Sequence, residues 1–229
     1  MLGGYADAVG RKFLDRQNKL VTRLSPVGRQ LNSQDETTLN ANCVILAWFE
    51  EVYRSRLVSP GLDILLRLAN VKGLISGVQS DMVQDISQLS SAFAVDAKGL
   101  FKFKSDPILN PTFEGSTDVG GADADMIVDK ALMEFKCTSK LDAPKLRDAA
   151  LQLLGYMLLD YDGEYDVSDL LVYLPRQRFF WRIPLWKLVL APEAVQEILK
   201  RGDTPKTEEV SEQLRKRRLE FRTVAKSRK

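Results

Sequence analysis

The chain has 229 residues, of which 45% are hydrophobic and 28% are charged, and its formal net charge is +2. This composition is ordinary for a globular α/β protein, and the near-neutral charge neither favours nor excludes nucleic acid as a partner. Because the sequence has no histidine and only two cysteines, it excludes histidine-dependent catalysis, a zinc cluster and a disulfide framework. Acid–base or metal chemistry must use Asp, Glu, Lys, Tyr or Cys, and carboxylate ligands favour Mg²⁺ or Mn²⁺.

The first hundred residues predict helices. Apolar positions in the polar segment 1–36 suit a short amphipathic helix, and residues 37–57 have clearer helical spacing. Two further helices are expected over 62–74 and 82–93. Since no apolar signal-peptide core opens the chain and no run of about 18 apolar residues follows, we expect a cytoplasmic protein that does not span a membrane.

Beyond residue 99 the pattern changes to strands mixed with helices. Strands are expected over 100–104, 122–128, 131–138, 170–174 and 179–183, and helices over 142–160 and 185–201. We therefore expect an α/β fold with a mixed central β-sheet flanked by helices and a helical N-terminal section. Three parts are predicted, a polar segment 1–36, an α/β domain 37–202 and a basic C-terminal helix or tail 203–229.

A hairpin over residues 122–137 is the most informative segment. If its turn is centred on Asp129-Lys130, Asp125 faces Glu134 across the two strands. Because side chains alternate along a strand, four charged groups then share one face: Asp123, Asp125, Glu134 and Lys136. Asp-Lys is not a preferred two-residue turn, and a slip of one residue would separate Asp125 from Glu134. A solvated charge ladder is the alternative interpretation.

Two carboxylates at this spacing favour a bound cation. Directly opposed side chains have Cβ atoms about 4.5–5.5 Å apart, so the two negative charges repel each other. Such a pair either shares a proton or binds a cation. Mg²⁺ typically takes one or two carboxylates and keeps several waters, one of which, near Lys136, can serve as the nucleophile.

Asp125 followed by Glu134-Phe135-Lys136 resembles the PD-(D/E)xK nuclease superfamily, although Ala124 stands where the name has proline. On the helix that follows, Gln152 and Tyr156 resemble the QxxxY pattern of the RecB-like branch. The resemblance covers roughly residues 115–185 and implies a restriction-endonuclease-like core. Helical spacing also puts Gln152 and Tyr156 on one polar strip, which faces either solvent or the carboxylates. We expect the second arrangement.

Carried over by position, the resemblance implies that Asp125 and Glu134 bind the metal, with the carbonyl of Phe135 as a further ligand. Lys136 would orient or activate water, while Gln152 and Tyr156 would help to arrange the site and its substrate. Three further acids have open roles. Asp123 is either an extra ligand or a salt-bridge partner of Lys136, and Glu50 or Glu51 is either an upstream ligand or part of a solvated helix face.

Weaker signals surround the strand at 179–183. Arg176, Arg178 and Arg182 flank the aromatic run Phe179, Phe180 and Trp181, which suits nucleic-acid contacts but also a plain surface hairpin. Cys137 is expected to point into the core.

The function implied by the resemblance is that of a metal-dependent deoxyribonuclease, a hydrolase that uses Mg²⁺ or Mn²⁺ to cleave phosphodiester bonds. The alternative is a catalytically silent nucleic-acid-binding or interaction module on the same fold. DNA is the expected partner.

Overall fold

The computed structural model describes residues 4–24, 31–55, 57, 70–102, 104, 106–140 and 142–227. Its contacts group into two compact units, Met1–Ser91 and Ala92–Lys229, with the division inside helix α5 (Ser80–Leu100). Each unit has its own hydrophobic core. The three-part division expected from the sequence stays a prediction.

The first unit is helical, as expected. It contains α1 (Gly4–Leu24), α2 (Ser33–Ser55), α4 (Val71–Ser76) and the beginning of α5. Its core is made by four buried side chains from three helices: Val9, Phe13, Ile45 and Leu74. Most of the helix expected over 62–74 lies outside the described residues.

The second unit is built on a five-stranded mixed sheet with the order β1-β2-β3-β4-β5. The strands are β1 (Ile108–Leu109), β2 (Met126–Val128), β3 (Ala131–Phe135), β4 (Asp169–Leu174) and β5 (Phe179–Pro184). Neighbours pair antiparallel except β3 and β4, which are parallel and are joined by α6 (Ala143–Leu159). This connection is a βαβ unit, and it places α6 over the sheet next to the end of β3.

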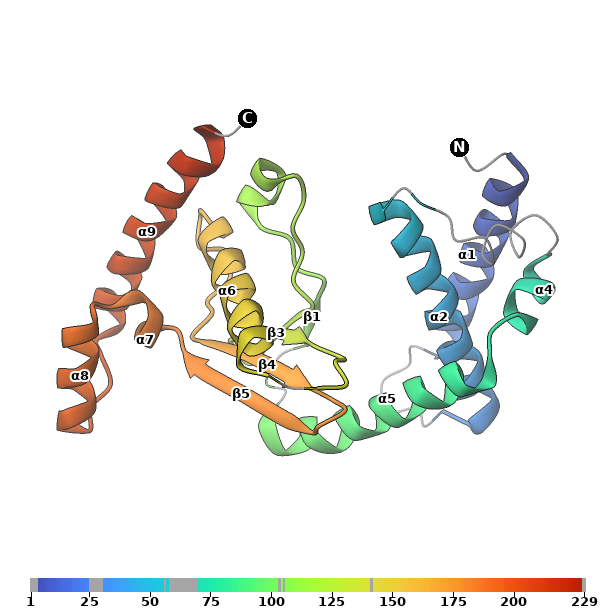
Figure 1. Cartoon of the computed structure of the whole chain (residues 1–229), viewed down its shortest axis with the longest axis horizontal. Helices are drawn as coiled ribbons and strands as arrows, with labels where there is room; N and C mark the ends of the chain where they lie inside the picture. The colour runs from blue at the N-terminus through green and yellow to red at the C-terminus, as the bar shows by residue number, and fades with distance from the viewer. Residues whose placement is uncertain are drawn as a thin grey trace. The chain divides into compact units, whose positions relative to one another are not determined.

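Helices cover both faces of this sheet (Figure 1). On one face Leu132 and Leu170 pack with Leu153 and Met157 of α6. On the other face Met133, Leu171 and Tyr173 pack with Ala97 and Phe101, at the end of α5. Alternate residues of β3 and β4 therefore enter different cores, which explains why these strands are almost continuously apolar.

Helix α6 begins where capping chemistry predicts, and a buried ion pair follows its last residue. The side chain of Asp142 accepts a hydrogen bond from the backbone N–H of Lys145 at 2.9 Å, and Pro144 lies in the first turn. At the other end, the carboxylate of Asp160 is buried and accepts a hydrogen bond from Arg218 of α9 (Thr207–Ser227) at 2.6 Å. The basic C-terminal segment is thus a helix that packs on α6.

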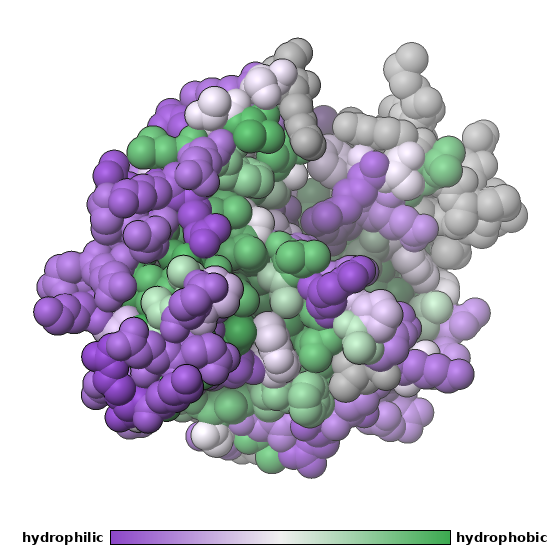
Figure 2. All heavy atoms as spheres, turned by 60° about the vertical axis from the view of Figure 1, so that its left-hand side comes forward, coloured by the Kyte–Doolittle hydropathy of each residue, from purple (hydrophilic) through white to green (hydrophobic). Residues whose placement is uncertain are grey.

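The remaining elements of the second unit lie around α6 and α9. They are the short helix η1 (Glu114–Val119), α7 (Trp186–Val189) and α8 (Pro192–Arg201). A groove between α6, α7 and α9 is lined largely by hydrophobic side chains. Figure 2 turns the α8 and α9 side forward, and hydrophobic surface is visible there between hydrophilic side chains.

Some predicted elements were wrong or too long. The strand expected over 100–104 was wrong for the described residues of that range, because α5 runs to Leu100 and the backbone N–H groups of Lys102 and Lys104 bond to Asp129 instead of a neighbouring strand. The strands expected over 122–128 and 131–138 pair only over β2 and β3. Among the described helices, none is long and apolar enough to cross a membrane.

Candidate active site

The hairpin register predicted from the sequence is confirmed. Met126 pairs with Met133, Ile127 with Leu132 and Val128 with Ala131, so the turn is Asp129-Lys130. Continuing this register, Asp125 precedes β2 at the level of Glu134 in β3. The charged residues thus sit where the two short strands begin and end, beside α6.

The turn is held by contacts outside the hairpin. Asp129 and Lys130 both have positive φ, 46° and 66°, the backbone of a turn that normally prefers Asn and Gly. The Asp129 carboxylate accepts hydrogen bonds from the backbone N–H groups of Lys102 and Lys104, at 2.6 and 2.9 Å. The Lys130 carbonyl accepts from the backbone N–H of Ser168 at 2.9 Å. These bonds explain how an unfavourable turn sequence keeps the register.

Asp125 is fixed against the neighbouring strand. Its Oδ2 accepts a hydrogen bond from the backbone N–H of Phe135 at 2.7 Å. Since the N–H and C=O of one residue in an extended strand point to the same edge, the Phe135 carbonyl also points towards the β2 side. The three oxygen groups expected to bind a metal therefore belong to adjacent positions of β2 and β3.

Glu134 is a buried carboxylate, with only 5% of its surface exposed. Its Oε1 accepts a hydrogen bond from Lys136 Nζ at 2.7 Å, whereas its buried Oε2 has no hydrogen-bond partner among the described residues. Burial raises the pKa of Glu134 above its ordinary value, the bond from Lys136 opposes this, and the negative charges of Asp125 and Asp123 raise it further. The positive charge of Lys136 therefore does not fully offset the burial of the ionised carboxylate and the nearby negative charges.

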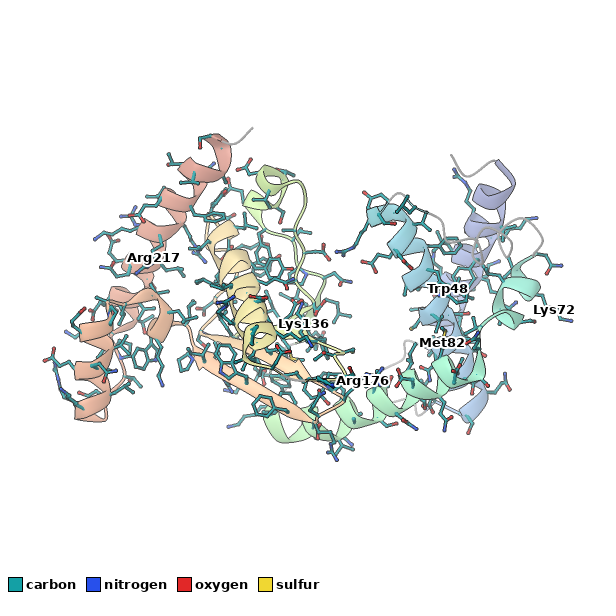
Figure 3. All side chains as sticks on the ribbon, viewed as in Figure 1. Trp48, Lys72, Met82, Lys136, Arg176 and Arg217 are labelled. Carbon is teal, nitrogen blue, oxygen red and sulfur yellow. The ribbon has the colours of Figure 1, made fainter. Side chains whose placement is uncertain are left out.

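A chain of hydrogen bonds joins Glu134 to α6. Besides Glu134, Lys136 Nζ donates to Gln152 Oε1 at 2.9 Å, and Gln152 Nε2 donates to the hydroxyl of Tyr156 at 2.6 Å. Figure 3 shows Lys136 beside α6. The polar strip of α6 thus faces the charged hairpin at these two residues, the arrangement we expected. Asp160, one turn beyond Tyr156, pairs with Arg218.

Tyr156 is positioned by an aromatic neighbour that sequence reasoning missed. The ring of Phe113 stacks on that of Tyr156 with centroids 5.7 Å apart. Burial raises the pKa of Tyr156, and the negative charges of Glu134, Asp123 and Asp125 add to this effect. The phenol therefore keeps its proton, which it can donate. Phe113 lies in an irregular loop after Pro111, where no periodic pattern reveals it.

Two further candidate ligands, Asp123 and Glu50, have described contacts of their own. Asp123 is exposed and forms a bridge with Thr112, and no group of three or more Asp, Glu or Cys side chains in the described parts of the chain is arranged to hold a metal. Asp123 therefore does not complete a three-carboxylate cluster with Asp125 and Glu134. Glu50 belongs to the first unit, where it pairs with Arg54 at 2.7 Å.

The three arginines chosen for nucleic-acid binding are not part of the network either. Arg182 pairs with Asp169 and Arg178 with Asp96. Arg182 lies opposite Leu171 in the sheet, so it is on the α5 face, whereas Glu134 and Lys136 are on the α6 face. Arg176 lies at the turn between β4 and β5 (Figure 3). Their role in nucleic-acid binding stays a prediction.

The expectation for Cys137 was wrong. Its side chain is exposed rather than buried in the core. The reason is that β3 ends at Phe135, so the alternation that would have turned Cys137 inwards has stopped.

No family model, no curated protein and no solved structure matches this chain. The candidate site therefore stands on the geometry of its own residues.

That geometry fits a small divalent cation. The candidate donors are the carboxylates of Asp125 and Glu134 and the carbonyl of Phe135, and all of them are oxygen groups. Hard cations such as Mg²⁺ prefer oxygen and often bind through only one or two carboxylates plus water. The unpartnered Oε2 of Glu134 is a buried acceptor that a cation would satisfy.

Proposed function

We propose that this protein is a metal-dependent nuclease that hydrolyses phosphodiester bonds of DNA. The observation that carries the proposal is the buried Glu134 carboxylate, which has one oxygen without a partner, lies near the negative charge of Asp125 and is bonded to Lys136. A carboxylate pair with one buried member and a lysine at its side suits phosphoryl chemistry, in which negative charge must be both bound and stabilised.

In this proposal Asp125, Glu134 and the carbonyl of Phe135 hold Mg²⁺ or Mn²⁺. When bound, the ion supplies a water of lowered pKa and offsets charge on the phosphate. Lys136, Gln152 and Tyr156 provide the rest of the positioning, through hydrogen bonds that are present without the ion.

Lys136 is the residue that meets the substrate phosphate. Its ammonium has three N–H donors, and Glu134 and Gln152 accept two of them. The third can bond a phosphate oxygen or the attacking water. Gln152 fixes the ammonium from the α6 side, and Tyr156 holds Gln152 in turn, so that both act as positioning residues.

The test is cleavage of linear, circular and single-stranded DNA, and of RNA, in Mg²⁺, Mn²⁺ or EDTA. We expect DNA cleavage that EDTA abolishes. Glu134→Gln and Lys136→Met should each reduce the rate at least roughly a hundredfold, the effect typical of removing one group that stabilises transition-state charge. The matched controls are Glu197→Gln and Lys200→Met on the exposed surface of α8, which should cleave like the wild type.

Two results would overturn the proposal. If the wild type binds DNA but does not cleave it with either metal, the chain is the silent binding module that was the alternative. If cleavage occurs but the Glu134 and Lys136 variants retain it, the active site lies elsewhere.

A further inference from the structure

A pocket of about 230 Å³ lies directly beside the Glu134–Lys136 pair. Two residues of α6 and two of β4 give it an aliphatic floor: Leu146, Ala149, Val172 and Leu174. The other lining residues are polar, with charges of both signs: Lys136, Thr138, Lys145, Asp148 and Gln152. The pocket shares Lys136 and Gln152 with the candidate site, but its aliphatic floor takes no part in the hydrogen-bond network.

The combination of lining residues restricts what can occupy the pocket. A phosphate does not suit an aliphatic floor, because its oxygens would lose their hydrogen bonds to water without replacement. A flat heterocycle does suit it, since burial against apolar side chains stabilises its ring faces. Lys136 lies at the same pocket and can contact the phosphate of that nucleotide, whereas Lys145 pairs with Asp142 at 3.2 Å.

We propose that this pocket receives one unstacked nucleobase of a single strand, next to the phosphate that Lys136 contacts. The inference rests on the proposed nuclease function and names its substrate class. In a duplex the bases are paired and stacked, and a base reaches such a pocket only after leaving the stack, which costs free energy. The chain therefore prefers single strands, or strand ends that open easily, to intact duplex.

The experiment measures binding rather than cleavage. Fluorescence anisotropy with the full chain in EDTA compares a short labelled thymidine strand, an abasic strand of equal length and charge, and the same thymidine strand in a duplex. We expect the wild type to bind the thymidine strand roughly tenfold more tightly than the abasic strand, the size of effect that contact with a single base gives. The duplex should bind no better than the abasic strand.

Pocket-filling variants isolate the contribution of the pocket. Ala149→Leu adds bulk to the floor, and Leu146→Trp fills the pocket from a half-buried position should Ala149→Leu fail to fold. Both should bring the thymidine-to-abasic affinity ratio close to one while leaving abasic binding unchanged. Ala150→Leu, the same substitution one residue along α6 and outside the pocket lining, should keep the wild-type ratio.

The outcomes separate this proposal from the nuclease proposal. A wild type with a ratio of one, or folded pocket-filling variants with the wild-type ratio, would overturn the base pocket even if DNA is cleaved. A pocket made for an apolar side chain of a protein partner would likewise give a ratio of one. Conversely, base-dependent binding that the filling variants abolish supports the pocket even if no metal promotes cleavage, and then only the nuclease proposal fails.

Discussion

Glu134, at the centre of the candidate site, destabilises the fold when its carboxylate is ionised. A carboxylate that is 5% exposed has lost most of its hydration, and only one of its oxygens has a described partner. Buried charges are usually paired or bind metals, because an uncompensated one destabilises the fold. The positive charge of Lys136 offsets part of this destabilisation, and a bound cation would offset the rest.

Because the ionised carboxylate is destabilising, we predict that Glu134→Gln makes the fold more stable when no divalent ion is present, and that this gain depends on pH. The pKa of Glu134 is raised in the folded chain, so the protonated form favours folding and this contribution is lost as pH rises through the folded pKa. The amide has no charge to desolvate, and its N–H groups can point towards Asp125. We expect the variant to be more stable than the wild type by about 1 kcal/mol at pH 8.

The gain should shrink as pH falls towards the ordinary glutamate value of 4.5, where the wild type takes up its proton in both states. Thermal unfolding in EDTA across this pH range is the measurement, and Glu197→Gln on exposed α8 is the control. A variant that is no more stable than the wild type at pH 8, or whose gain is the same at low pH, would show that Glu134 is not strained by burial.

At the scale of elements, the β2–β3 hairpin depends on one side chain in its turn. Asp129 bonds two backbone N–H groups of the segment after α5, and its own φ is positive. Aspartate tolerates this backbone better than most residues, because its short side chain bonds locally. The register that aligns Asp125 with Glu134 therefore depends on hydrogen bonds to the segment that follows α5.

Asp129→Ala should consequently destabilise the chain by about 1–2 kcal/mol, because two N–H groups lose their acceptor and alanine enters a strained backbone. Asp129→Asn should cost less, since asparagine accepts this φ and keeps one carbonyl acceptor. Chemical denaturation of both variants gives the comparison. If Asp129→Ala falls within about 0.5 kcal/mol of the wild type, the hairpin itself holds the register and the tertiary bonds do not.

Local patterns predicted the elements whose determinants are local. Strict alternation and a two-residue turn were enough to pair Asp125 with Glu134, and Asp142 with Pro144 marked the start of α6. Long-range pairing was not predictable. Arg178 pairs with Asp96, which is far away in sequence, and Arg182 pairs with Asp169 on the neighbouring strand. The alternating pattern of residues 100–104 did not indicate that a backbone N–H group of this segment would bond Asp129. The pocket beside Lys136 also needs α6 and β4 together.

At the scale of the whole molecule, the candidate site belongs to one unit. Asp125, Glu134, Lys136 and Gln152 all lie within residues 92–229, and so does the proposed base pocket. The described contacts of the network do not involve the helical first unit. The residues proposed to bind the metal thus belong to the second unit, and the role of Glu50 stays a prediction.

Metal binding by these residues is the claim on which the rest depends. Titration of the full chain with Mn²⁺, followed by electron paramagnetic resonance of the free ion, measures it without any substrate. We predict saturable binding by the wild type and at least tenfold weaker binding by Asp125→Asn and by Glu134→Gln, with Glu50→Gln and Glu197→Gln unchanged. Equal affinity in the wild type, Asp125→Asn and Glu134→Gln, or no binding by the wild type, would contradict the account.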